Sequence, residues 1–218
     1  MAKDICLFGG TFDPVHHGHL IVARAVAEAR GFERVTLIPA NCPPHKAPAR
    51  ASAADRLAML RLAVQGDGLF EVSDLELGRA GPSYTLDTLQ AVRGKMGKAN
   101  LHWLIGMDSL ADLPHWHRVE EVLGLARIVI AGRPGPEGES VLEGLAGKLA
   151  VSHLARLRAG VVPTPLIDIS STDIRRRVCE GKSVGYLVPE AVARYIAERG
   201  LYQEPDPPKS QGDCSCPR

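Results

Sequence analysis

Short apolar runs alternate with amphipathic segments along most of this chain, and that alternation limits the possible folds more than any other feature. Strands buried on both faces of a parallel sheet appear in a sequence as continuous apolar runs. Strand-like stretches occur at 5–8, 34–40, 69–77, 101–105, 126–132 and 165–170. Between them lie helical stripes with stop signals such as Gly31. The pattern predicts an α/β fold with a doubly wound, Rossmann-like, mostly parallel sheet of about five strands flanked by helices, and a small C-terminal helical part.

A chain of this length can bury a core as one large domain or two small ones, and we expect a single domain over 1–202. Residues 203–218 are polar and proline-rich, which predicts a disordered tail. Within the domain, 135–160 is expected to form a glycine-rich turn and one helix. Candidate helix caps are Ser52, either Ser83 or Thr85, and Asp108.

Charge and hydropathy exclude two classes of partner. The formal net charge is +1, and the longest basic run is Arg175–Arg177, so nothing indicates binding to nucleic acid. No stretch approaches the roughly 20 apolar residues of a membrane span. A cytoplasmic protein that does not enter membranes is the expectation.

Polar clusters follow the ends of several predicted strands, at 9–19, 41–46, 106–108 and 170–175. In a doubly wound sheet, ligands bind beyond the carboxyl ends of the strands. We therefore expect these four clusters to form one ligand site.

The cluster at 9–19, with the sequence GGTFDPVHHGH, allows three interpretations. His16, His19 and Asp13 are candidate metal ligands, but no further His/Cys pair has ligand spacing. The histidines are alternatively solvated helix caps. The third interpretation is a phosphate site, because Gly10 permits close backbone approach, Gly18 leaves room beside His19, and a helix N-terminus offers unpaired N–H groups. The pattern matches neither of the common glycine-rich phosphate loops.

Two motifs of this sequence resemble the signatures of a known protein superfamily. The run His16-His17-Gly18-His19 resembles the (H/T)-x-G-H signature of the nucleotidyltransferase α/β-phosphodiesterase superfamily. The run ISSTDIR, at 169–175, resembles its second motif, I-S-S-T-x-x-R, about 150 residues further along. Over 3–202 the chain is similar to the bacterial nicotinate-mononucleotide adenylyltransferases, with PPHK at 43–46 and LPHWHR at 113–118 as supporting segments.

The resemblance implies transfer of the adenylyl group of ATP to nicotinate mononucleotide, giving nicotinate adenine dinucleotide and pyrophosphate. The acceptor is a phosphate monoester with a second pKa of about 6, so it is mostly ionised at neutral pH and needs no general base. The histidines are then expected to stabilise charge on the triphosphate. Mg²⁺ is expected to arrive with ATP, with few protein ligands.

The resemblance also implies a role for each motif residue. The catalytic residues it implies are His16, His19, Lys46 and Arg175. The ATP-binding residues it implies are Gly9, Gly10, Thr11, Phe12, His16, Gly18, His19, Gly106, Asp108, Ile169, Ser170, Ser171, Thr172 and Arg175. The nicotinate mononucleotide site is expected to include Lys46, Tyr84, Thr85, Asp108, Trp116 and Arg133, with Trp116 stacked on the pyridine ring.

Other functions stay open at this point. The acceptor is alternatively nicotinamide mononucleotide or phosphopantetheine, because spacing does not distinguish an acid from an amide. A non-catalytic nucleotide-binding regulator is a different class of protein with the same pocket. Intact His16, His19 and Arg175 favour an enzyme over such a regulator. The oligomeric state is not fixed by the sequence, and a homo-oligomer is compatible with it.

Overall fold

The computed structural model describes residues 3–44, 48–132 and 136–207. The described chain forms two compact units. The first unit contains residues from 1–9, 22–36 and 84–166, and the second contains residues from 10–21, 37–83 and 167–218. The expectation of a single domain over 1–202 stays a prediction.

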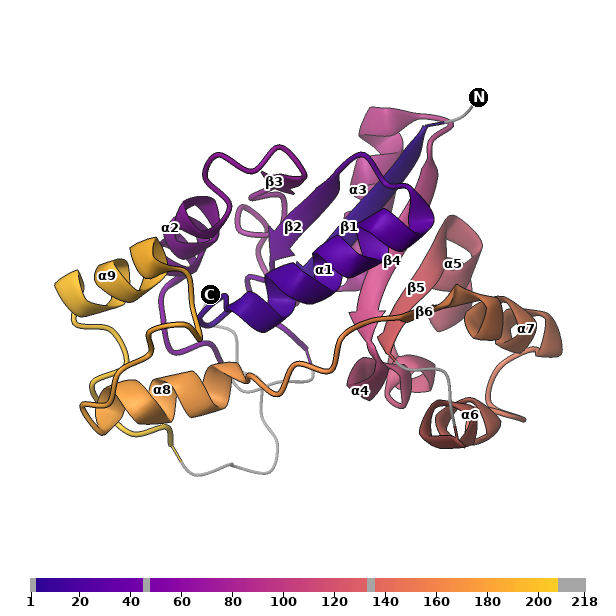
Figure 1. Ribbon diagram of the computed structural model, residues 1–218. Helices are drawn as coiled ribbons and strands as arrows, with labels where there is room; N and C mark the ends of the chain where they lie inside the picture. Colours follow the sequence, from indigo (N-terminus) through magenta and orange to yellow (C-terminus); the bar gives the residue numbers. More distant parts are fainter. Residues whose placement is uncertain (1–2, 45–47, 133–135, 208–218) are drawn as a thin grey trace. The chain divides into compact units, whose positions relative to one another are not determined.

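Strands and helices alternate as expected, in a parallel six-stranded sheet with the order β3-β2-β1-β4-β5-β6 (Figure 1). The order reverses direction between β1 and β4, which is the switch point of a Rossmann-like sheet. This confirms the predicted fold class. The strands are β1 (Asp4–Gly10), β2 (Val35–Pro39), β3 (Phe70–Val72), β4 (Asn100–Gly106), β5 (Ala126–Gly132) and β6 (Val161–Pro163). The helices are α1 (His17–Arg30), α2 (Ala53–Ala63), α3 (Thr85–Met96), α4 (Met107–Leu110), η1 (Leu113–His115), α5 (Val119–Leu125), α6 (Pro136–Glu143), α7 (Val151–Gly160), α8 (Ser171–Cys179) and α9 (Glu190–Glu198).

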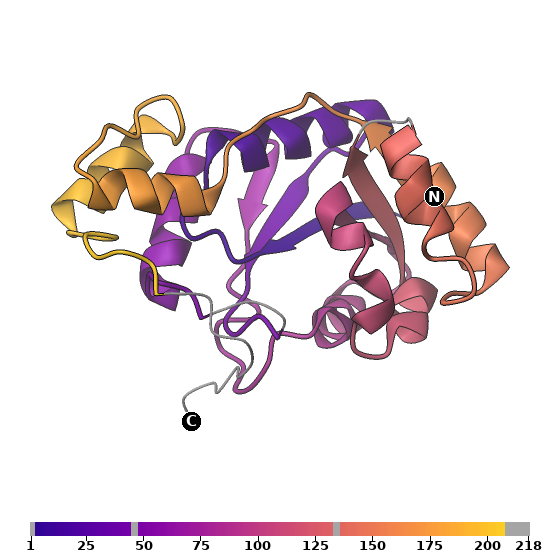
Figure 2. The same cartoon turned by 90° about the horizontal axis from the view of Figure 1, so that it is seen from below.

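The first unit is built on β1, β4, β5 and β6. Leu101 pairs with Ala126, and the register continues to Gly106 with Ala131. The interior residues of β4, from Leu101 to Ile105, are all buried. Helix α7 packs on β5, and α6 packs on α7 and α4, which can be followed in Figure 2. The continuous apolar runs were therefore correct signals of buried parallel strands.

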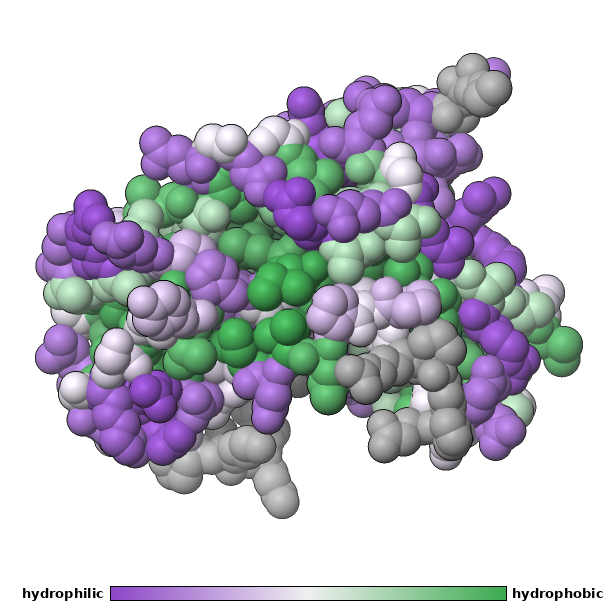
Figure 3. Space-filling model, in the orientation of Figure 1, coloured by the Kyte–Doolittle hydropathy of each residue, from purple (hydrophilic) through white to green (hydrophobic). Residues whose placement is uncertain are grey.

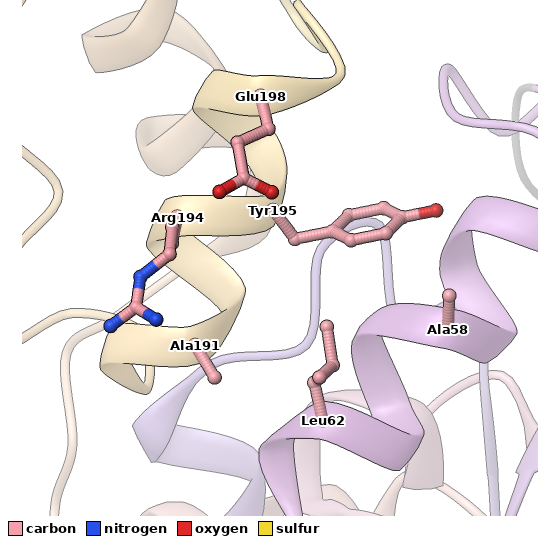
Figure 4. Close-up of a pocket in the computed structure, with 6 residues that line it drawn as sticks. All are labelled: Ala58, Leu62, Ala191, Arg194, Tyr195 and Glu198. Atoms are coloured by element: carbon pink, nitrogen blue, oxygen red, sulfur yellow. The ribbon is translucent and has the colours of Figure 1, made fainter.

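The second unit contains β3 and helices α2, α8 and α9. Ser52 caps α2 as expected, because its Oγ accepts a hydrogen bond from the Asp55 backbone N–H at 3.1 Å. Helix α2 packs along α9 (Figure 1). An open groove of about 470 Å³ runs between these helices, lined by Ala58, Leu62, Ala191, Arg194, Tyr195 and Glu198. Figure 4 shows the Tyr195 ring reaching from α9 toward Ala58 on α2.

Three local expectations were wrong. The strand expected at 165–170 does not form; β6 lies earlier, at Val161–Pro163, where it pairs with β5. The segment 135–160 holds two helices, α6 and α7, instead of one. Neither Ser83 nor Thr85 caps α3, because Tyr84 is the N-cap residue. Among the described residues, no helix is long and apolar enough to span a membrane.

Candidate active site

The turn at the end of β1, residues 10–16, is held through its backbone carbonyl groups. In a trans peptide the carbonyl and the following N–H point in opposite directions. The N–H groups of Thr11 and Phe12 therefore each point away from the hydrogen-bonded carbonyl of their own peptide group, Gly10 O and Thr11 O respectively. Four carbonyls accept hydrogen bonds from distant groups: Gly10 O from Ala40 N at 2.9 Å, Thr11 O from Arg56 Nη1 at 2.8 Å, Asp13 O from Arg175 Nη1 at 2.7 Å and Pro14 O from Ser171 Oγ at 2.9 Å.

A buried arginine that the sequence analysis missed supports this turn. Arg56, on α2, is 1% exposed, and its Nη1 donates to Thr11 O and to Ala40 O at 2.7 Å. Burial lowers the pKa of its guanidinium, and the charge of Asp13 opposes that shift. An arginine stays charged in a protein even so. A positive charge therefore lies behind the turn and adds to its attraction for an anion.

Phe12 is buried with a left-handed backbone, at φ 49°. A Cβ on Gly10 would meet the ring of Phe12 at 3.1–3.3 Å. Gly10 is therefore required to make room for this ring, in addition to any approach of a ligand to its backbone. The rings of Phe12 and His19 lie in a T-shaped arrangement, with their centroids 5.0 Å apart.

His16 and His19 lie one above the other, with ring centroids 3.6 Å apart. The backbone N–H of His16 donates to Nδ1 of His19 at 3.3 Å. A neutral His19 therefore carries its proton on Nε2, which is the atom that can donate to a phosphate oxygen.

His16 is only 6% exposed. Its burial, with the charge of His17 as a second cause, lowers its pKa to about 4. His16 is consequently neutral at physiological pH and acts as a polar group, not as a cation. Among the described residues, its Nδ1 is buried without a hydrogen-bond partner.

Gly18 adjoins His16, not His19 as the sequence analysis expected. A Cβ at this position would meet Nδ1 of His16 at 3.0 Å and Cγ2 of Ile167 at 3.3 Å. A side chain here would push His16 out of its stack. The expected supply of unpaired N–H groups at the start of α1 is also smaller than predicted, because His17 N donates to Leu187 O at 2.9 Å and His19 N to His16 O at 3.0 Å.

The second motif begins α8, over which hydrophilic side chains gather in Figure 3. Ser170 caps the helix by accepting from Asp173 N at 3.1 Å, and Ile169 precedes it, partly buried. Ser171 donates to Pro14 O, and Thr172 Oγ1 accepts from Arg175 Nη2 at 3.3 Å. The two motifs, far apart in sequence, are therefore joined directly within the second unit.

The carboxylate of Asp13 holds the turn in place. Because its oxygens accept hydrogen bonds for this purpose, Asp13 is not a candidate metal ligand beside the histidines. Its carboxylate is 4% exposed and accepts from Arg50 N at 2.6 Å, Ala51 N at 3.1 Å and the Tyr202 hydroxyl at 2.6 Å. Within the described ranges, no group of three His, Cys, Asp or Glu side chains could hold a metal ion.

The first unit holds two further groups of predicted site residues. The first group lies at the ends of β1 and β4. A Cβ on Gly9 would clash with the ring of Trp103. Gly106 ends β4 and is the N-cap residue of α4, so Asp108 is not the cap; it lies exposed in the first turn of that helix.

The second group of predicted site residues surrounds the start of α3. Tyr84 precedes Thr85, the first residue of α3, and its ring stacks on that of His117 at 4.3 Å between centroids. Trp116, next to His117, follows η1 and is partly buried. The ring in contact with Tyr84 is therefore that of His117, which was not among the predicted site residues. Lys46 and Arg133, the remaining predicted site residues, lie outside the described residues.

Comparison with known proteins identifies the class of this fold and site. A sequence model of the family described as cytidylyltransferase-like matches residues 7–177. The chain belongs to this family of nucleotidyltransferases.

Relatives of high sequence identity show which group within this family the chain belongs to. The "Probable nicotinate-nucleotide adenylyltransferase" of Thermomicrobium roseum is 46% identical over 198 residues, with 90% of each chain covered. The protein of the same name from Pectobacterium atrosepticum is 44% identical over 214 residues, with 90% of this chain and 97% of the relative covered. The chain therefore belongs with the nicotinate-nucleotide adenylyltransferases, as the two motifs indicated.

Solved structures agree on the fold. The Plasmodium falciparum nicotinic acid mononucleotide adenylyltransferase complexed with NaAD gives a TM-score of 0.71 at 18% identity, with 92% of this chain and 98% of the other covered. The same enzyme complexed with APC gives a TM-score of 0.70 at 17% identity, with the same coverage.

Proposed function

We propose that this chain transfers the adenylyl group of ATP to nicotinate mononucleotide, giving nicotinate adenine dinucleotide and pyrophosphate in NAD biosynthesis. The printed names of its relatives support this reaction. One structural observation carries it: Ser171 and Arg175 of the second motif bond to the carbonyls of the first motif's turn. That link between the two motifs supports a single anion site made of backbone N–H groups, imidazoles and a guanidinium.

In the proposed reaction, an oxygen of the acceptor phosphate attacks the α-phosphorus of ATP. A new P–O bond forms, the bond from the α-phosphorus to the bridging oxygen breaks, and pyrophosphate leaves with the electron pair. The attacking phosphate is already ionised near neutral pH. The protein's contribution is alignment and stabilisation of charge on the phosphates.

Each part of the turn has a role in this proposal. The N–H groups of Thr11 and Phe12, with the close backbone of Gly9 and Gly10, approach the phosphates. Nε2–H of His19 donates to the α-phosphate, with His16, neutral at physiological pH, stacked beneath it. Gly18 preserves the space that His16 occupies.

The second motif takes the outer phosphates of ATP. Arg175 binds the β/γ end, with Ser170, Ser171 and Thr172 at the N-terminus of α8 completing that end of the site. Lys46 contributes a further cation. Ile169, Gly106 and Asp108 complete the nucleotide site, with Asp108 near the ribose.

The acceptor site in this proposal uses the aromatic residues of the first unit. Trp116 stacks on the pyridine ring, Tyr84 and Thr85 lie near it, and Asp108, Lys46 and Arg133 contact the remainder of the mononucleotide. The stack of Tyr84 on His117 supports this role, because it fixes the Tyr84 ring at the start of α3.

Mg²⁺ belongs to the proposal as the partner of ATP, neutralising phosphate charge. The described residues offer no cluster of protein ligands. Phosphate oxygens and water are the main ligands expected for Mg²⁺ that arrives with ATP. A cytoplasmic location fits an enzyme that uses ATP, and homo-oligomer formation stays a prediction.

The test is pyrophosphate release from Mg-ATP with nicotinate mononucleotide, nicotinamide mononucleotide or phosphopantetheine in parallel. The proposal expects the fastest release with nicotinate mononucleotide. Faster release with either other acceptor would assign a different substrate. No release with any acceptor would favour a nucleotide-binding regulator.

A further inference from the structure

The segment after Tyr202 brings a carboxylate to the proposed triphosphate arginine. Asp206 accepts from Arg175 through Nε to Oδ1 at 3.0 Å and through Nη2 to Oδ2 at 2.5 Å. The Arg175 side chain is 15% exposed and the Asp206 side chain 31%. This is a two-point pair, the geometry in which arginine also binds phosphate.

A second arginine faces the same carboxylate. Nε of Arg50 lies 3.8 Å from Oδ1 of Asp206, and the Arg50 side chain is 29% exposed. The backbone N–H of Arg50 is fixed by Asp13. Hydrogen bonds from Arg175 hold the pKa of Asp206 below its usual range. Two cations therefore converge on one anion within the second unit.

The hydrogen bonds of Arg175 show which of its edges the carboxylate occupies. A guanidinium has five N–H donors. Nη1 donates to Asp13 O and Nη2 to Thr172 Oγ1, so these two bonds anchor the group on the turn and on α8. Asp206 takes the Nε/Nη2 edge, which is the edge suited to a two-point anion. The guanidinium thus has two partners other than Asp206, one on the turn and one on α8.

We propose that Asp206 is an internal competitor of the terminal phosphates of ATP for the Nε/Nη2 edge of Arg175, and that Arg50 is a second cation for those phosphates. This inference rests on the proposed function, which assigns Arg175 to the triphosphate. Nucleotide binding exchanges one anion for another at the arginine pair. The pairing with Asp206 lowers the apparent affinity for ATP, because part of the protein holds this edge occupied.

The test compares Asp206→Asn with Glu204→Gln in the full-length chain. Both variants remove one carboxylate from the same short segment, and Glu204 is exposed. Calorimetry measures the Kd of Mg-ATP and of AMP, and steady-state assays measure KM and kcat. Asp206→Asn is expected to tighten Mg-ATP about three- to tenfold and to leave AMP, which lacks the outer phosphates, unchanged. Glu204→Gln is expected to change neither.

Weaker or unchanged ATP binding by Asp206→Asn would overturn the proposal, and weaker binding would make Asp206 a positioning residue. Equal tightening of AMP and ATP would also overturn it. Arg50→Gln in the Asp206→Asn background is expected to weaken the binding of Mg-ATP by several-fold. An unchanged Kd would show that Arg50 does not contact the phosphates. A wild type that binds Mg-ATP but releases no pyrophosphate with nicotinate mononucleotide would contradict the proposed function alone. A wild type that does not bind Mg-ATP would overturn both.

Discussion

The hydroxyl of Tyr202 donates to Oδ1 of Asp13 at 2.6 Å, across 189 residues of sequence. Both side chains are buried, at 7% and 4% exposed. Burial raises the pKa of Tyr202, and the charge of Asp13 raises it further, so the hydroxyl stays protonated and remains a donor. The segment that follows α9 is thus tied to the turn that carries the first motif.

Replacing Tyr202 by Phe removes this donor and leaves a buried carboxylate with one hydrogen bond fewer. We expect the free energy of unfolding to fall by about 1–3 kcal/mol, measured by urea denaturation. Tyr186→Phe is the control, because Tyr186 is 96% exposed and its hydroxyl should contribute little. Equal effects of the two substitutions would show that the Asp13–Tyr202 bond contributes nothing to stability.

Gly18→Ala places a methyl group against His16 and Ile167, at 3.0–3.3 Å. We expect a loss of stability of about 1–2 kcal/mol from overpacking and a larger proportional loss of kcat, since the shift displaces His16 from His19. Gly94→Ala is the control: Gly94 lies within α3, and a Cβ there has nothing within 4 Å. That change should stabilise the protein by about 0.5–1 kcal/mol without affecting kcat. A normal kcat in Gly18→Ala would show that His16 is not part of the catalytic site.

The lowered pKa of His16 predicts an acid-dependent loss of stability. Its pKa is about 4 in the folded protein against 6.5 ordinarily. As pH falls from 6.5 to 4, the unfolded chain binds a proton that the folded protein does not, so the free energy of unfolding decreases. The slope from this one group is at most about 1.4 kcal/mol per pH unit, and above pH 6.5 the contribution is fully present.

His16→Gln should therefore flatten the decline in unfolding free energy between pH 6.5 and 4, relative to the wild type. NMR titration of the His16 ring gives a direct value that does not depend on the variant folding. A measured His16 pKa near 6.5 would contradict the neutral, buried state inferred for it.

The strands and the two motifs were predictable because their signals are local. Buried parallel strands such as β4 and β5 need continuous apolar runs, and the turn after β1 needs its glycines. The strand expected at 165–170 did not form because strand formation depends on a pairing partner; β5 pairs instead with Val161–Pro163.

The residues that hold the site were not predictable in this way. Arg56, Tyr202 and Asp206 act through contacts 16 to 189 residues away, and no periodicity or spacing marks them. Arg56 follows Asp55 in α2, and two adjacent charged residues in a helix suggest a solvated face until the carbonyl partners of Arg56 are known. Similarly, sequence placed Gly18 near His19, and only the packing shows that it adjoins His16.

The central claim is that His19 holds a phosphate as a hydrogen-bond donor and does not act as a base. The most direct measurement is kcat for adenylyl transfer by His19→Gln and His19→Ala, with unfolding curves for both. Glutamine carries an amide N–H near the position of Nε2 but cannot accept a proton as a base. We predict that His19→Ala remains folded and has a kcat about 100-fold or more below that of the wild type. The kcat of His19→Gln should be at least about tenfold higher than that of His19→Ala. Equal, low activity of the two folded variants would contradict the account.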